Sequence, residues 1–505
     1  MSRDCGRASQ PSKPADLTKI SHAAHPPVGT SAAGKVKIAA GEIVGTFRNV
    51  CCQLHASAVA SVLVLAIVAV SFRPLEQGVA ASALPPAEMP ASNEPGNQGF
   101  LYGRVTTDAG AAYQGRMRFG RDQEAFWGDY FNGVKATNPW TSHTPDGQLA
   151  EKRRPFTIFG FEIPLGERQV DLSRPFMSRF GDIARIEARS HRHVRVTLKS
   201  GAVFDLNRMA ANDFDDGVRV WDDKGGVIDL ASWAGGIPPP ARVSIRAIDF
   251  LPTPRLAASP TRLHGTVRTS QGDFSGFVQW DRQDCTGLDE LVGRTDSGEQ
   301  RIRFDSIRSI ARRSGDSAMV TLVAGREITL SGTRDVGRDN RGVYVDDRRY
   351  GRVLVNWATF ERIDFSASGS GPAYSDFAPG RPLIGSVLTH DGRRLTGRLV
   401  YDLDESETTE TLDAPSQGVD YTIPFSLIAS ITPAGGEERD SRHARVTLHS
   451  GEVLRLDRGG DLGSANAGML IFIDGRDRPE YVRWIDIKQV DFNRPAALSP
   501  PLVGG

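Results

Sequence analysis

The chain has 505 residues, a length that allows several domains, each with its own buried core. Its 61 Lys and Arg residues equal its 61 Asp and Glu residues, so no net charge would draw it to nucleic acid or to an anionic surface. Only one of its four cysteines, Cys285, follows residue 52, which excludes an intrachain disulfide framework beyond that point. We therefore expect no nucleic-acid partner.

The first 99 residues divide into three segments. Residues 1–53 are rich in Ser, Ala, Pro and Lys and are predicted to be a disordered basic leader. Residues 54–72 form an apolar run whose length lies between that of a short membrane span and that of a signal peptide. Residues 73–99 form a Pro- and Ala-rich linker, in which Ala83 ends a small-residue cleavage site. We expect export, through a cleaved signal or a retained membrane anchor, and the competing interpretation is a buried apolar helix.

The remaining sequence repeats one β-rich pattern three times. Each copy opens with an alternating strand and a glycine turn, and an aromatic residue stands four positions after the last glycine of this segment. Coincidences at fixed offsets predict a duplicated fold. The opening segments are LYGRVTTDAGAAYQG from Leu101, LHGTVRTSQGDFSG from Leu263 and LIGSVLTHDGRRLTG from Leu383.

A hairpin pattern marks the second half of each copy. Apolar residues alternate on both sides of a glycine, which is the period of two expected of strands with one buried face. Each copy then closes with an I/V-D-F triplet, at residues 248–250, 363–365 and 490–492. The hairpins read VTLKSGAVFDL from Val196, VTLVAGREITL from Val320 and VTLHSGEVLRL from Val446, with turn glycines Gly201, Gly325 and Gly451.

These patterns predict an all-β fold of three tandem small β-barrel-like modules, after a disordered N-terminal tail and one apolar helix. The predicted modules are residues 100–252, 263–365 and 383–493. Two Pro-, Gly-, Ser- and Ala-rich segments, at 251–262 and 366–382, are predicted to be linkers. The first module carries an insertion at 129–177 that the other two lack.

With their short strands and tight glycine turns, the copies resemble SH3-like or Sm-like small barrels and the repeats of bacterial exported proteins of unassigned function. The resemblance covers about 390 residues and implies a fold rather than a set of catalytic residues. Sm-like barrels often bind RNA. The sequence lacks the basic and aromatic surface that this would require.

The repeated aromatic residues are the candidate binding residues. Phe119, Trp280 and Tyr401 occupy one repeat position, and a ring near a strand end can stack on a ligand. The alternative interpretation is that they fill the core, because each follows an alternating strand. We favour core filling and keep ligand stacking as a hypothesis.

Catalytic and metal sites find little support. The acidic loops at 212–217, 334–342 and 460–468 could bind calcium, but Asn, Asp and Gly are also the ordinary residues of turns. His191 and His193 could share a strand face as metal ligands, yet arginines are interleaved with them. Cys285 has no histidine near it in sequence, and no G-x-S-x-G motif occurs. We expect no catalytic residues, no metal and no cofactor.

The sequence therefore predicts an exported, non-catalytic binding or scaffolding protein of the cell envelope. Its expected location is the periplasm or the cell surface, with anchoring in the inner membrane if residues 54–72 are not cleaved. The expected partner is an envelope protein or polysaccharide. The alternative is an envelope hydrolase or carbohydrate-active enzyme whose site lies in the insertion at 129–177.

Overall fold

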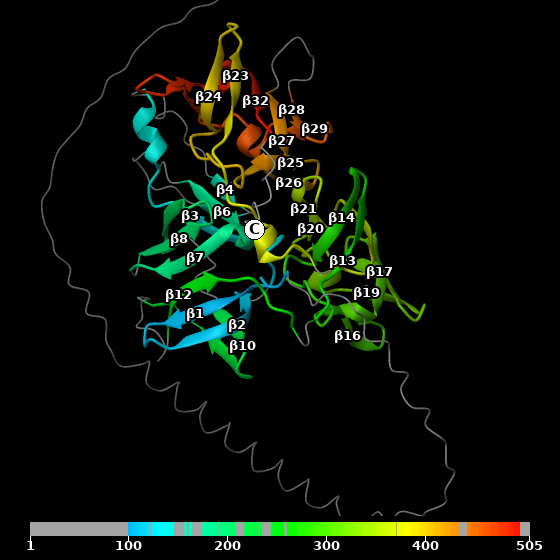
Figure 1. Ribbon diagram of the computed structural model, residues 1–505. Helices are drawn as coiled ribbons and strands as arrows, with labels where there is room; N and C mark the ends of the chain where they lie inside the picture. Colours follow the sequence, from blue (N-terminus) through cyan, green and yellow to red (C-terminus); the bar gives the residue numbers. More distant parts are fainter. Residues whose placement is uncertain are drawn as a thin grey trace, which may run out of the picture. The chain divides into compact units, whose positions relative to one another are not determined.

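The structure, a computed structural model, describes residues 99–494 apart from eleven gaps (Figure 1). The predicted leader, the apolar segment 54–72 and the linker up to residue 98 lie outside the described residues, as does His191. In the described ranges, no helix is both long and apolar enough to cross a membrane. The gaps are residues 121–122, 146–155, 159–160, 164–173, 191, 209–216, 232, 235–243, 257–259, 370 and 434–441.

The predicted all-β class is confirmed for this part of the chain, which belongs to one compact unit. Its helices are short 3-10 segments that join strands. They are η1 (Pro139–His143), η2 (Phe180–Asp182), η5 (Phe304–Ser306), η6 (Arg334–Val336), η7 (Tyr374–Asp376), η8 (Phe425–Leu427), η9 (Gly460–Leu462) and η10 (Trp484–Asp486).

The first sheet has eight strands in the order β11-β10-β2-β1-β12-β7-β8-β9, and all its pairs are antiparallel. Its opening strand lies beside its closing strand, with Val105 opposite Ile248. The bounds are β1 (Tyr102–Thr107), β2 (Ala112–Phe119), β7 (Ile183–Ala188), β8 (His193–Leu198), β9 (Val203–Asn207), β10 (Val218–Asp222), β11 (Val227–Leu230) and β12 (Ile245–Phe250).

The second sheet has twelve strands in the order β16-β15-β19-β18-β17-β22-β13-β14-β20-β21-β26-β25. The bounds are β13 (His264–Thr269), β14 (Gly272–Gln279), β15 (Glu290–Thr295), β16 (Gly298–Arg303), β17 (Ile307–Ser314), β18 (Ser317–Leu322), β19 (Glu327–Ser331), β20 (Val343–Asp347), β21 (Gly351–Val355), β22 (Phe360–Phe365), β25 (Thr411–Ser416) and β26 (Val419–Pro424).

The third sheet has eight strands in the order β29-β28-β27-β32-β23-β24-β30-β31. The bounds are β23 (Ile384–Thr389), β24 (Arg394–Val400), β27 (Ile428–Thr432), β28 (His443–Leu448), β29 (Val453–Asp457), β30 (Met469–Phe472), β31 (Glu480–Val482) and β32 (Ile487–Phe492). Two small sheets lie in the predicted insertion and the residues that follow it, and they pair β3 (Tyr130–Val134) with β6 (Pro175–Arg179) and β4 (Phe156–Ile158) with β5 (Phe161–Ile163).

One order of strand pairing occurs in all three larger sheets. The series β11-β10-β2-β1-β12-β7-β8-β9 corresponds to β21-β20-β14-β13-β22-β17-β18-β19 and to β31-β30-β24-β23-β32-β27-β28-β29. In each, the last strand of the series in sequence pairs with the first, which brings the I/V-D-F triplet beside the opening segment. The sequence motifs thus occupy equivalent places.

The repeated glycines have two physical roles. The first glycine of each opening segment lies so close to the neighbouring strand that a Cβ would overlap a backbone carbonyl, as at Gly103 against Asp249. Gly265 and Gly385 make the same approach to Asp364 and Asp491. The glycines of the repeated hairpins have φ of 88°, 87° and 91°, a conformation that favours glycine at a tight turn. Those hairpin glycines are Gly201, Gly325 and Gly451.

The sheets are joined by shared core and shared strands. A single apolar cluster runs from Leu263 through the second sheet and the third sheet to Phe492. The cluster of the first sheet includes Tyr374 and Phe377, which come from the segment predicted to be a linker. Strand β26, from the region predicted as the third module, pairs with β21, with Val419 opposite Val355. The predicted module boundaries therefore separate the three sequence copies, but the copies share core residues and strand pairing in the structure.

Candidate functional site

The three repeated aromatic residues lie inside apolar cores. Phe119 is 1% exposed, and Trp280 and Tyr401 are 0% exposed. The Trp280 indole N–H donates to the Asp335 carbonyl oxygen at 3.0 Å, and the Tyr401 hydroxyl donates to the Asp461 carbonyl oxygen at 3.0 Å. None of the three rings presents a face to a ligand. All three fill the core. They do not come together into a binding surface.

The acidic residues that follow these rings also have a structural role, because they accept hydrogen bonds from the backbone. One carboxylate in each copy accepts two backbone N–H bonds from the loop after the aromatic residue. Asp129 accepts from Glu124 and Ala125, Asp289 from Cys285 and Thr286, and Glu410 from Ser406 and Glu407, at 2.5 to 3.0 Å. This repeated role could have been predicted from the sequence, because an acid stands nine or ten residues after each aromatic residue.

The acidic loops proposed as calcium sites have a structural role where the structure describes them. Asp335 accepts a bond from the Val292 N–H at 2.7 Å, and Asp461 accepts one from the Asp413 N–H at the same distance. Asn340 closes its loop by donating to the Asp335 carbonyl oxygen and accepting from the Gly342 N–H. Among the described residues, no group of three or more metal-ligating side chains could hold an ion. The loop at 212–217 lies outside them except for Gly217.

Cys285 is unsuited to nucleophilic chemistry. Its side chain is 1% exposed, and burial, together with nearby Glu124 and Asp129, raises the pKa of the thiol well above its ordinary value. The reactive form of cysteine is the thiolate. At neutral pH this thiol stays protonated and behaves as a small apolar side chain.

The described part of the insertion packs against the segment between β24 and β25 and against Phe472 of β30 in the third sheet. The Lys135 ammonium contacts Asp404 at 2.7 Å and Glu410 at 3.2 Å, and all three side chains are nearly buried. Asn138 donates to the Leu403 carbonyl oxygen, and the Trp140 ring packs against Phe472 with centroids 6.0 Å apart. Burial lowers the pKa of Lys135, but the two carboxylates outweigh it and raise the pKa overall. The insertion thus uses its polar groups for attachment.

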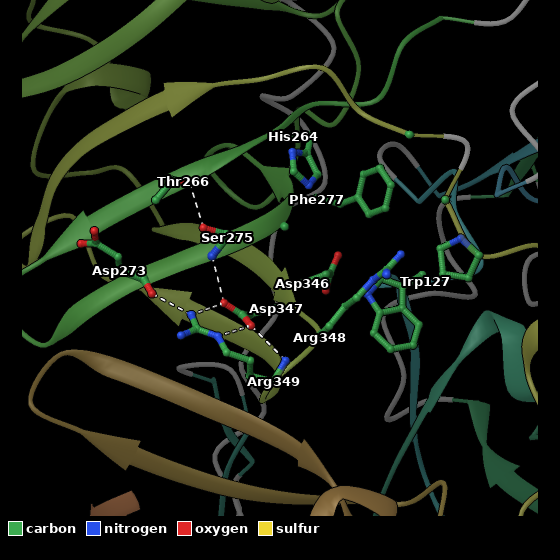
Figure 2. Close-up of a pocket in the computed structure, with 14 residues that line it drawn as sticks. Trp127, His264, Thr266, Asp273, Ser275, Phe277, Asp346, Asp347, Arg348 and Arg349 are labelled. Atoms are coloured by element: carbon green, nitrogen blue, oxygen red, sulfur yellow. Dashed lines mark hydrogen bonds and ion pairs between the residues drawn. The ribbon is translucent and has the colours of Figure 1, made fainter. Parts of the chain in front are cut away.

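A cleft of about 550 Å³ lies beside the outer face of strands β13, β14 and β20 (Figure 2). Its other wall comes from Trp127, just before the insertion, and from Gly369, Gly371 and Pro372 of the segment predicted to be a linker. Residues far apart in sequence therefore build one concavity. Clefts that combine apolar rings with a few polar groups are the usual place for ligands.

Asp346 is the most unusual group in this cleft. Its side chain is 5% exposed and accepts no hydrogen bond from any residue that the structure describes. In Figure 2 its carboxylate lies among Phe277, Arg348 and Trp127. Burial raises its pKa to about 7, against the opposing effect of Arg262 and Arg352. A buried carboxylate without a donor is costly unless a ligand or water supplies one.

The rim of the cleft carries both signs of charge. Arg348 is exposed and has no ion-pair partner among the described residues, whereas Arg349 is bound to Asp347 at 2.6 Å. Asp273 is also exposed, and its backbone carbonyl accepts a bond from Arg349. His264 contacts the Ser366 hydroxyl at 2.8 Å, and burial and the two arginines Arg262 and Arg348 lower its pKa. The imidazole is therefore neutral at pH 7.

No motif in the sequence predicted this cleft. Asp346 and Arg348 stand in a strand and a turn without a motif, and Trp127 reaches them only because the first and second sheets are in contact. In comparisons with protein-family models, with curated proteins and with solved structures, the chain matches none.

Proposed function

We propose that the protein is a non-catalytic binding or scaffolding protein of the cell envelope, built from three tandem β modules and exported by means of residues 54–72. The modules are residues 100–252, 263–365 and 383–493, and the common pairing order of the three sheets supports this division. The partner is an envelope protein or polysaccharide. If residues 54–72 are retained, the chain is anchored in the inner membrane.

The observation that carries the binding function is the cleft beside Asp346. It combines a buried carboxylate that lacks a donor, an exposed Arg348 and the rings of Trp127 and Phe277. By contrast, the acids at repeated positions are occupied in backbone bonds, as at Asp289 and Glu410. Catalysis needs an acid, base or nucleophile constellation that converges on one pocket. The cleft offers groups for recognition and lacks an activated nucleophile among its described residues.

The enzyme alternative, with a site in the insertion at 129–177, has less support. Lys135 and Asn138 bond to the segment between β24 and β25, and Asp129 accepts two backbone bonds and one from Gln279. These side chains lie in interfaces between parts of the chain, where a substrate would have to displace them.

Binding is tested by capture of solubilised envelope fractions on the immobilised full chain. The Arg348→Glu variant should lose the captured component, because it reverses an exposed rim charge that has no ion-pair partner among the described residues. The matched control is Arg326→Glu, which changes an exposed arginine in a hairpin turn away from the cleft. Equal capture by the two variants would argue against the cleft, and turnover of a polysaccharide or peptide would support the enzyme alternative.

Export is tested separately. A reporter that is active only outside the cytoplasm, fused after Gly99, should be active, and deletion of residues 62–70 should abolish its activity. Sequencing of the mature N-terminus then distinguishes a cleaved signal from an anchor. Activity that survives the deletion would contradict the role of residues 54–72.

A further inference from the structure

We propose that the cleft beside Asp346 binds a neutral, hydroxyl-rich saccharide, with Trp127 as the ring on which a sugar packs. This inference rests on the proposed binding function and specifies its ligand. It depends on three observations: the unsatisfied acceptor in the cleft wall, the balance of charge around it and the ring at its mouth.

The wall of the cleft contains a hydrogen-bond acceptor, the Asp346 carboxylate, that has no donor among the described residues. Asp346 lies on β20 and is 5% exposed. Its carboxylate packs against Gly128. None of the described residues donates a hydrogen bond to it, although Arg262 and Arg352 are near enough to act on its charge. A sugar hydroxyl can donate to this carboxylate in either of its protonation states, since the protonated acid keeps acceptor capacity.

The charges around the cleft argue against a strongly ionic ligand. Asp273, Asp346 and Asp347 line the cleft together with Arg348 and Arg349, and Arg262 lies 4.2 Å from the centre of the Phe277 ring. An ammonium ligand would meet the arginines, and an anionic ligand would meet the aspartates. A neutral ligand with several hydroxyls can instead accept from Arg348 and donate to Asp273 and Asp346 at the same time.

Trp127 supplies the apolar part of the site. Its ring is partly exposed, and its position is fixed from behind by Phe377, 5.8 Å away between centroids, and by Arg179 at 5.1 Å. A ring fixed in this way loses little conformational entropy on binding, which is the usual advantage of aromatic residues at binding surfaces. The less polar face of a sugar ring can pack on it while its hydroxyls reach the polar wall.

The experiment uses the purified full chain and three neutral trisaccharides, cellotriose, maltotriose and chitotriose, in titration calorimetry. At least one should bind with a Kd of roughly 1 mM or lower. Trp127→Ala and Arg348→Ala should each weaken its binding by about tenfold or more. The matched controls are Trp140→Ala, which lies in the insertion, and Arg326→Ala, and both should leave the affinity unchanged. Thermal unfolding of every variant checks that it is folded.

Two further probes separate this inference from the proposed function. Polygalacturonate carries anionic sugars, and trialanine carries an ammonium and a carboxylate. If either binds in a manner lost on Arg348→Ala while no neutral trisaccharide binds, the assignment of a neutral saccharide is overturned and the binding function stands. Failure of all five probes overturns the saccharide assignment too. Hydrolysis of a bound trisaccharide would overturn the non-catalytic function while leaving the ligand class correct.

Discussion

Gly128 and Asp346 are packed so closely that a Cβ at position 128 would overlap the Asp346 carboxylate. This contact joins the segment before the insertion to the outer face of β20. Gly128 also has φ of 86°, and its carbonyl oxygen accepts a bond from Arg352 at 2.9 Å. The fit of the first sheet's loop onto the second sheet therefore depends on the absence of a side chain here.

Gly128→Ala should destabilise the protein by about 2 kcal/mol or more, because it adds overlap with a buried carboxylate to an unfavourable φ. The matched control is Gly201→Ala, whose φ of 88° is nearly the same but whose Cβ would meet open space. That variant should lose about 1 kcal/mol. Denaturant unfolding measures both values. Equal losses would mean that the overlap is relieved without cost.

Lys135→Met should destabilise the protein by about 3 kcal/mol, because it leaves Asp404 and Glu410 buried without their cation. Lys224→Met, at an exposed turn, should change stability by less than about 0.5 kcal/mol. Adding Asp404→Asn to Lys135→Met should recover part of the loss, since it removes one of the two like charges. A double variant less stable than the single variant would contradict this account.

Asp346→Asn should change the pH dependence of stability. Asp346 titrates near pH 7 in the folded protein and near pH 4 when unfolded, so the folded state holds the extra proton between these values. Stability therefore falls as the pH rises from about 4 to about 7, by at most about 1.4 kcal/mol per pH unit for one group. The variant should lose this part of the slope.

The groups that act on Asp346 are Arg262, Arg352 and Arg179, which lower its pKa, and Asp129, which raises it. Asp129 has its own raised pKa of about 6 and will contribute a slope of the same sign in both proteins. The comparison is therefore the difference between the two unfolding curves from pH 4 to 7. Parallel curves would show that Asp346 titrates normally.

Asp335→Ala should cost about 1 to 2 kcal/mol, because the Val292 N–H loses its acceptor. Asp339→Ala, in the same loop but exposed, should have little effect. Calcium or a chelator should leave the melting temperature of the wild-type chain unchanged, since the loop's oxygens are used in backbone bonds. A rise in melting temperature with calcium that Asp335→Ala removes would restore the calcium interpretation.

Local patterns predicted the features that depend on nearby residues. Turn glycines such as Gly201 and Gly451, and the alternation along β8 and β28, follow from backbone conformation and the period of a strand. Contacts between distant segments had no such signature. Lys135 meets Asp404 across 269 positions of sequence, and Tyr374 lies in a segment whose composition indicates a linker. The cleft could not be predicted because Trp127, Gly371 and Pro372 meet the β13–β14 hairpin only through contacts of this second kind.

The pairing of β26 with β21 has a consequence for shortened forms of the chain. A product that ends before Thr411 would keep β21 but lose the strand that covers its edge, and would expose backbone groups beside Val353 and Val355. Such an edge pairs readily with any available strand, including the same edge of another copy. Incomplete synthesis or a proteolytic cut after residue 366 would thus yield a fragment that self-associates, even where its remaining strands fold correctly.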